Sequence, residues 1–306
     1  MILISVNKPR LRQLACVVLA STLLAAGCGT AAEDERPLVI VTTTVLGDLV
    51  SRVAGADARV EVLLPIGVDP HDYQPSARQI ASLSAADLVV ANGLDLEQGL
   101  TEAISGAAAD GVRVLEVAPL VTPLPFPGGV TLDPHVWLDP VRMADAARIV
   151  AAALADVDPA AGFTSRGATV AAELLAADAE ISDVLAGIPV ERRLLVTNHE
   201  TLQYFAARYG FTVIGVVVPG GSTLAEPSSA ELAALVEVIR THHMPAIFVE
   251  TTSPSDLAAA GAAEVGTSVQ VVELHTESLG EPGSPESSLA GMLVENARRI
   301  AAALGG

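Results

Sequence analysis

Short apolar runs alternate with amphipathic segments along most of the chain. Runs such as Leu38–Val41 and Leu88–Ala91 are brief and apolar, which is typical of buried strands. The segments between such runs carry apolar residues at helical spacing, as Leu46, Leu49 and Val53 do. Strands that alternate with helices predict an α/β fold with mostly parallel sheets. The predicted strands are Leu38–Val41, Val60–Leu64, Leu88–Ala91, Val112–Val117, Leu194–Thr197, Thr212–Val218, Ala246–Val249 and Val269–Leu274.

The two halves of the chain repeat one order of segments. In each half a strand is followed by a proline-containing loop, a Pro-Ser dipeptide, a helical segment and another strand. The two dipeptides are Pro75-Ser76 and Pro227-Ser228. This repetition predicts two similar α/β lobes.

A long helical tract separates the two halves. Val141–Val157 is expected to form one helix, and Pro159 is suited to the first turn of the next. The second helix is expected from Ala160 to Leu185, about 39 Å at 1.5 Å per residue. A helix of this length would join the lobes as a stiff brace and allow them little relative movement. We expect an N-terminal lobe over residues 37–158, a linking helix over 159–187 and a C-terminal lobe over 188–306.

The N-terminal residues have the features of an export signal. Basic residues precede an apolar run over residues 14–26, which is too short to span a bilayer. The run ends in LAAGC, which resembles a bacterial lipobox except that Ala25 replaces the usual Leu. We expect a signal peptide over residues 1–27, lipidation of Cys28 and a polar tether over 28–36. Ordinary secretory cleavage nearby is the alternative.

Charge and composition exclude several classes of function. The chain has 17 Lys plus Arg and 36 Asp plus Glu, and this net charge of −19 argues against a nucleic-acid ligand. Its single lysine, Lys8, lies in the predicted signal peptide, which excludes a Schiff-base lysine and a GxxxxGK phosphate loop. Cleavage of the predicted signal peptide would remove Cys16 and leave Cys28 as the one cysteine of the chain. The mature protein is therefore expected to have no intramolecular disulfide and no cysteine-ligated zinc. We expect the lipid to hold the protein on the extracytoplasmic face of a membrane.

Four of the six histidines follow predicted strands. His71 and His199 lie shortly after strands, His135 lies in the loop after Val112–Val117, and His275 and Glu277 follow the last strand. Ligands of open α/β sheets bind at the carboxyl ends of the strands. Both halves of the chain therefore supply side chains that suit a shared metal site.

Each of these residues also has a simpler explanation. A lone loop histidine is usually solvated or hydrogen-bonded, and Asp-Pro dipeptides form turns without any metal. Acidic residues in such loops are most often solvated or cap helices, and this explanation applies to Asp72, Asp133 and Asp139. The shared placement of the histidines is what favours a metal site.

Five motifs occur in order along the chain: GVDPHDYQPS, DPHVWLDP, NHETLQYFAARYG, FVE and LHTESLG. Together they resemble the zinc- and manganese-binding solute-binding proteins of metal ABC transporters, the ZnuA/TroA-like group of periplasmic proteins and lipoproteins. The resemblance covers residues 37–306, and DPHxWLDP is highly specific. It implies two α/β lobes joined by one long backbone helix, with the metal held between them. It also implies a monomer that delivers its metal to a membrane permease with a cytoplasmic ATPase.

The resemblance implies four metal ligands. The first three fall on His71, His135 and His199; at the third position zinc binders have His and manganese binders generally have Glu. The fourth falls on Glu277, where many members of the family have Asp. Three further residues are alternatives or support the ligands: His275, Glu200 and Glu250.

The ligand set favours Zn²⁺ over Mn²⁺ or iron. Three imidazoles and one carboxylate suit a four-coordinate zinc ion, whereas Mn²⁺ prefers more oxygen ligands. Several zinc importers of the family that this chain resembles carry a histidine-rich loop at the place that follows His71. This chain lacks such a loop, which weakens the preference for zinc slightly. We therefore expect zinc capture and delivery without catalysis, and the alternative within the family is a manganese- or iron-binding protein.

A zinc hydrolase is the alternative from another class. Glu200 next to His199 would serve as its general base. The helical HExxH spacing of many zinc hydrolases is missing, because Thr201, Leu202 and Gln203 follow.

Overall fold

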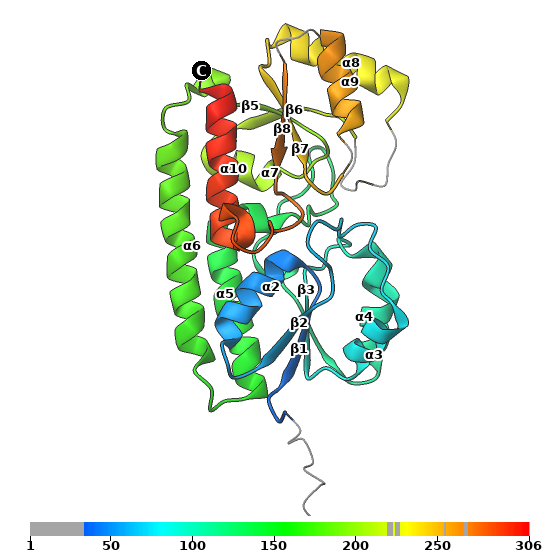
Figure 1. Cartoon of the computed structure of the whole chain (residues 1–306), viewed down its shortest axis with the longest axis vertical. Helices are drawn as coiled ribbons and strands as arrows, with labels where there is room; N and C mark the ends of the chain where they lie inside the picture. Colours follow the sequence, from blue (N-terminus) through cyan, green and yellow to red (C-terminus); the bar gives the residue numbers. More distant parts are fainter. Residues whose placement is uncertain (1–33, 219–222, 224–226, 254, 266–268, 306) are drawn as a thin grey trace, which may run out of the picture. The chain divides into compact units, whose positions relative to one another are not determined.

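A computed structural model of the chain describes residues 34–218, 223, 227–253, 255–265 and 269–305. Within residues 37–306 these described parts form two α/β lobes with a layer of long helices beside them (Figure 1). The expected α/β class is confirmed: two parallel four-stranded sheets are each packed between helices. The predicted signal peptide and Cys28 lie outside the described residues.

The N-terminal lobe contains a parallel sheet in the strand order β2-β1-β3-β4. Its strands and helices alternate along the chain, as the apolar pattern predicts, and the observed strands differ from the predicted ones by no more than two residues at either end. In chain order the elements are β1 (Leu38–Val41), α2 (Thr44–Ala54), β2 (Arg59–Val62), α3 (Ala77–Ser84), β3 (Leu88–Ala91), α4 (Thr101–Ala109) and β4 (Arg113–Glu116).

The C-terminal lobe repeats this topology, with its parallel strands in the order β6-β5-β7-β8. The first strand of each lobe therefore lies inside its sheet and pairs with the second and third. The elements are β5 (Leu194–Thr197), α7 (Gln203–Tyr209), β6 (Thr212–Val216), α8 (Ser229–Thr241), β7 (Ala246–Glu250), α9 (Asp256–Val265), β8 (Gln270–Leu274) and α10 (Leu289–Leu304). Short 3₁₀ helices are η1 (Gln98–Leu100), η2 (Ala118–Leu120), η3 (Val136–Leu138), η4 (Val190–Arg192) and η5 (Pro285–Ser287).

The two Pro-Ser dipeptides start equivalent helices. Ser76 accepts a hydrogen bond from the backbone of Gln79 at the start of α3, and the Gln79 side chain accepts one in return. Ser228 and Glu231 make the same reciprocal pair at the start of α8. Both capping boxes satisfy backbone N–H groups that a helix start leaves without partners. The repeat in the sequence thus corresponds to a repeat in local structure.

Two long antiparallel helices follow, α5 (Pro140–Val157) and α6 (Phe163–Leu185). The α5 helix lies beside the N-terminal lobe, whereas α6 runs along both lobes and packs against α2 of the first and α10 of the second (Figure 1). The expectation that Pro159 opens the second helix is wrong, because α6 starts at Phe163 with Gly162 as its N-cap. Asp158 instead accepts hydrogen bonds from the backbones of Ala160 and Ala161, which makes a turn of the segment between the helices.

One hydrophobic core is common to both lobes. It includes Val39 and Leu195 from the two sheets, Phe163 and Ile181 from α6, and Ile300 from α10. The opposite face of each sheet has a smaller core of its own, under α3 and α4 in the first lobe and under α8 and α9 in the second. The lobes are therefore joined by continuous apolar packing and not by a linker alone.

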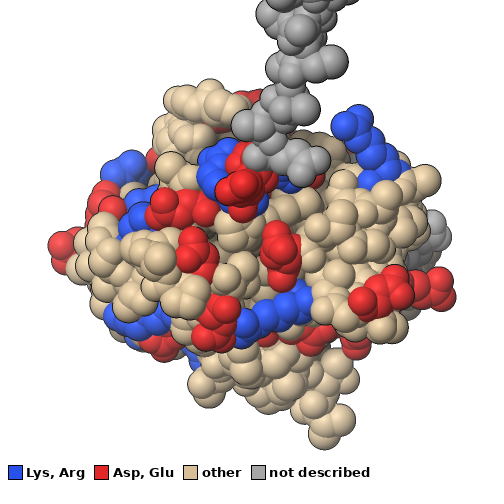
Figure 2. Space-filling view, turned by 90° about the horizontal axis from the view of Figure 1, so that it is seen from below, with Lys and Arg blue, Asp and Glu red and all other residues tan. Residues whose placement is uncertain are grey.

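The acidic excess of the chain lies mainly on its surface. Only six acidic side chains are buried among the described residues, although the whole chain has 36. Figure 2 shows acidic and basic side chains next to one another on the face seen from below, and surface pairs such as Arg113–Asp156, at 2.6 Å, link them. Three of the six buried acids, Asp133, Glu250 and Glu277, lie together with the histidines described next.

None of the helices in the described residues has the length and apolar character needed to cross a membrane.

Candidate metal centre

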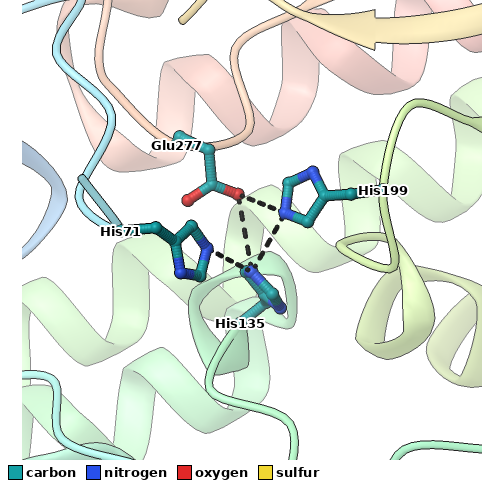
Figure 3. A group of neighbouring side chains, drawn as sticks. All are labelled: His71, His135, His199 and Glu277. Carbon is teal, nitrogen blue, oxygen red and sulfur yellow. Dashed lines mark hydrogen bonds and ion pairs between the residues drawn. The ribbon is translucent and has the colours of Figure 1, made fainter. Parts of the chain in front are cut away.

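Three imidazoles and one carboxylate converge between the lobes (Figure 3). His71 follows β2, His135 precedes η3 after β4, His199 follows β5 and Glu277 follows β8. All four side chains are buried, and their four ligand atoms lie within 4.8 Å of one another. The structure therefore brings together all four residues that the family motifs single out.

Four of the six distances between these ligand atoms are close to those between the ligands of a tetrahedral zinc ion. His135 Nε2 lies 3.4 Å from His71 Nε2 and 3.3 Å from His199 Nε2. Glu277 Oε1 lies 3.6 Å from His135 Nε2 and 3.5 Å from His199 Nε2. Four ligands at about 2.0–2.1 Å from a tetrahedral zinc ion are about 3.3–3.4 Å apart. Nitrogen lone pairs this close repel one another unless a cation or a proton lies between them.

Two of the three imidazole rings are held by buried carboxylates. His135 Nδ1 donates to Asp133 Oδ1 at 2.7 Å, and His199 Nδ1 donates to Glu250 Oε1 at 2.7 Å. A proton fixed on Nδ1 leaves the Nε2 lone pair free for a metal. Glu250 thus has the supporting place that the family resemblance implies.

Asp133 and Asp139 have different roles in the structure. Asp139 caps α5 by accepting from the backbone of Val141, as the sequence suggests for such an acid. Asp133 is fully buried and accepts from both the backbone and the ring of His135. The expectation of a solvated or capping residue is therefore wrong for Asp133, which orients a histidine of the centre.

His71 is held differently from the other two histidines. Its backbone N–H donates to Asp69 Oδ1 at 2.8 Å, but its ring Nδ1 is buried without a hydrogen-bond partner among the described residues. Asp69 accepts instead from Thr223 Oγ1 of the other lobe, at 2.5 Å. The two Asp-Pro-His segments thus form the same kind of turn. The Asp133 carboxylate also binds the ring of its own histidine, whereas the Asp69 carboxylate binds a residue of the other lobe.

Burial and neighbouring charges set the protonation of the centre. Burial, with the nearby imidazoles, lowers the pKa of His71 to about 3 and lowers the pKa of His135 well below its usual value. Burial also lowers the pKa of His199, but the bonded Glu250 outweighs this effect and raises it to about 9. Burial raises the pKa of Glu277 to about 8. At pH 7 without metal, His199 and Glu277 therefore hold protons, while His71 and His135 present lone pairs.

The alternative ligands do not join this centre. The metal-ligating group found in the described residues contains neither His275 nor Glu200. His275 is half-buried, and Asn296 of α10 binds both its backbone N–H and its carbonyl. Glu200 is half-buried next to His199.

Two supporting residues were not identified from the sequence. Thr201 Oγ1 donates to Glu277 Oε1 at 3.1 Å, and Trp137 Nε1 donates to the carbonyl of Thr276 at 2.6 Å. Each lies two residues after a histidine of the centre, and that spacing is the only signal the sequence carries.

Comparison with known proteins agrees with the geometry. Residues 39–303 match the ZnuA family, described as zinc-uptake complex component A, periplasmic. The chain is 33% identical to the zinc-binding protein TroA of Treponema pallidum, over 96% of this chain and 99% of that protein. It is 29% identical to the manganese-binding lipoprotein MntA of Halalkalibacterium halodurans, over 92% of this chain and 94% of that protein.

A solved structure of the periplasmic zinc-binding protein TroA from Treponema pallidum has the same fold, with a TM-score of 0.83 at 33% identity. The match covers 89% of this chain and 100% of that structure. The chain therefore belongs to the ZnuA family of metal-binding proteins, the substrate-binding components of metal ABC transporters.

Proposed function

We propose that the protein captures one Zn²⁺ between its lobes through His71, His135, His199 and Glu277, and delivers it to an ABC permease for import. The observation that carries this proposal is the convergence of three imidazoles and one carboxylate in a buried centre, where His135 Nε2 lies 3.3–3.6 Å from a ligand atom of each of the other three residues. Each lobe supplies two of the four ligands, His71 and His135 from the first and His199 and Glu277 from the second, so release requires the surroundings of the ion to change.

The donor set supports zinc over manganese. Zn²⁺ is borderline soft and accepts imidazole readily in a four-coordinate site, whereas Mn²⁺ favours carboxylate, carbonyl and water oxygens. Asp133 and Glu250 act on the imidazoles and do not enter the group of ligand atoms. They increase the basicity of the imidazole ligands, which strengthens bonds to zinc.

A manganese- or iron-binding protein is the second candidate. Several relatives are named for manganese and another for iron, and Glu277 Oε2 is buried without a hydrogen-bond partner in the described residues. If both oxygens of Glu277 bound the ion, the set would gain an oxygen ligand and suit Mn²⁺ better. A zinc hydrolase is disfavoured, because Glu277 takes the fourth position that a catalytic zinc leaves open for water.

Competitive metal loading tests the choice of metal. The purified protein is stripped with a chelator, incubated with equimolar zinc and manganese, separated from free metal and analysed for both. We expect about one zinc per chain and little manganese. Preferential retention of manganese would overturn the zinc assignment.

Replacement of His135 by Ala tests the site itself. The ring lies at the middle of the group, within 3.3–3.6 Å of the other three ligand atoms. Loss of an outer partner of a ligand typically weakens metal binding by about 10–100-fold, so we expect loss of this ligand to weaken zinc binding by more than about 100-fold in calorimetry. His242→Ala, which changes the exposed histidine after α8, is the control and should bind zinc as the wild type does.

We further propose that residues 1–27 are cleaved and that Cys28 carries the lipid that anchors the protein outside the cytoplasm. Residues 28–36 would be the tether, 37–158 and 188–306 the two lobes, and 159–187 the link between them. The protein would act as a monomer. Mass spectrometry of the membrane-bound protein would show a diacylglyceryl group on Cys28, whereas an N-terminus without lipid would contradict the anchor.

A further inference from the structure

The chain has a single tryptophan, and it lies beside the metal centre. Trp137 is 3% exposed and belongs to η3, two residues after His135. Its indole ring meets the His135 ring edge-on, with 5.3 Å between the ring centroids. Its Nε1–H donates to the carbonyl of Thr276 at 2.6 Å. Trp137 thus contacts one ligand of the centre and the residue that precedes another.

The Thr276 carbonyl belongs to the same peptide group as the nitrogen of Glu277. Because a peptide group is planar, a hydrogen bond to this carbonyl restricts the direction in which the Glu277 side chain leaves the backbone. At its other end the Glu277 carboxylate accepts from Thr201 Oγ1 at 3.1 Å. Trp137 follows β4 of the first sheet and Thr201 follows β5 of the second. Glu277 is therefore held from both lobes.

We infer that Trp137 is a positioning residue that sets Glu277 against the three imidazoles by fixing the Thr276–Glu277 peptide from the opposite lobe. This inference rests on the proposed function and adds a determinant of affinity that is not itself a ligand. Without this bond the β8 loop gains freedom, and the carboxylate no longer meets the ion at a fixed distance. The buried Thr276 carbonyl, left without this donor, adds to the cost.

A double-mutant cycle tests this inference. Zinc affinity is measured by competition with a chromophoric chelator for the wild type, Trp137→Phe, Glu277→Ala and the double variant. We expect Trp137→Phe to weaken zinc binding by about 10–100-fold, the range for outer partners of metal ligands. In the Glu277→Ala background the same change should have almost no further effect, because the residue through which Trp137 acts is missing.

Tyr204→Phe is the matched control. Tyr204 is also a fully buried aromatic residue with a hydrogen bond between the lobes, but its hydroxyl donates to the Asp133 carbonyl at 2.6 Å and accepts from Leu124. It therefore acts on the His135 segment and not on Glu277. Any loss caused by Tyr204→Phe should persist unchanged in the Glu277→Ala background.

A second replacement keeps the shape of the side chain. Because Trp137 is the only tryptophan, growth of an auxotroph on 3-benzothienylalanine replaces this one N–H by sulfur. The isostere should show the same loss of affinity as Trp137→Phe. Provided that the wild type binds zinc, either of two results would overturn the inference. In one, Trp137→Phe reduces zinc affinity equally with and without Glu277. In the other, both replacements of Trp137 leave zinc affinity unchanged. A wild type that binds no zinc would overturn the proposed function as well.

Discussion

A histidine ring can rotate unless its second nitrogen is held, and two of the three rings in this centre are held by carboxylates. Asp133 and Glu250 occupy corresponding places, each accepting from Nδ1 of a histidine in its own lobe. Glu250 also accepts from the side chain of Asn198, so its own position is fixed. The His71 ring has no such partner in the described residues, so its orientation depends most on the bound ion.

Replacement of Glu250 by Gln is expected to weaken zinc binding by about 10–100-fold. The amide keeps the shape of the side chain but removes the charge that fixes His199 and makes it a better ligand. Calorimetry measures the change. The control is Glu264→Gln on α9, whose side chain is 74% exposed. Equal affinities for the Glu250 variant and this control would contradict the role of Glu250.

Zinc binding at pH 7 is expected to release one to two protons. Glu250 raises the pKa of His199 to about 9 and burial raises the pKa of Glu277 to about 8, so both are protonated without metal. Zinc must displace these protons, hence affinity rises with pH and levels off above about pH 9. Calorimetry in buffers of different ionisation enthalpy counts the protons. Heats that do not depend on the buffer at pH 7 would show that the site is already deprotonated.

At the scale of the helices, α5 and α6 approach closely where Gly167 lies. A Cβ atom on Gly167 would be 2.5 Å from Ala151 Cβ and 3.0 Å from the Ala147 carbonyl oxygen. A glycine inside a helix by itself only weakens that helix. The structure shows that it permits the contact between the two helices.

Replacement of Gly167 by Ala is expected to destabilise the protein, although Ala favours a helix by about 1 kcal/mol. Overpacking costs about 1–3 kcal/mol and so outweighs the gain in helix propensity. Gly106→Ala in α4 is the control, because nothing lies within 4 Å of its added Cβ and the change should stabilise. Urea unfolding measures both, and a stabilised Gly167 variant would contradict the tight contact.

The sequence predicted elements well where a local pattern determines them. Strands such as β1 and β3 are short apolar runs, and Ser76 and Ser228 start helices through partners three residues away. The centre was also predictable in part, because parallel strands bring their carboxyl ends to one edge. The bond from Trp137 to Thr276 joins residues 139 positions apart, and no local pattern encodes that proximity. The role of Asp133 was missed because burial in the folded chain decides it.

At the scale of the whole molecule, the two lobes share one hydrophobic core. The core continues from the β1 sheet through α5 and α6 to the β5 sheet and α10. Separation of the lobes would expose this apolar surface to water, at about 25 cal/mol for each Å². The lobes are therefore expected to unfold together.

Thermal unfolding of the metal-free protein is expected to show a single transition, and zinc should shift that transition as a whole. A ligand present at 100 times its dissociation constant stabilises the native state by about 2.7 kcal/mol. Scanning calorimetry with and without zinc measures both properties, and the His135→Ala variant at the same zinc concentration is the control. Two transitions, only one of them moved by zinc, would show that the lobes unfold separately.

The shared core also affects how a transporter would distinguish full from empty carriers. If apolar packing holds the lobes in nearly one arrangement, loaded and empty proteins present almost the same outline to a permease. Recognition then depends on the few loops that carry the ligands, above all the loop of His71. Empty protein would compete with loaded protein for the same docking place, so the rate of import would depend on the fraction of carriers that hold an ion.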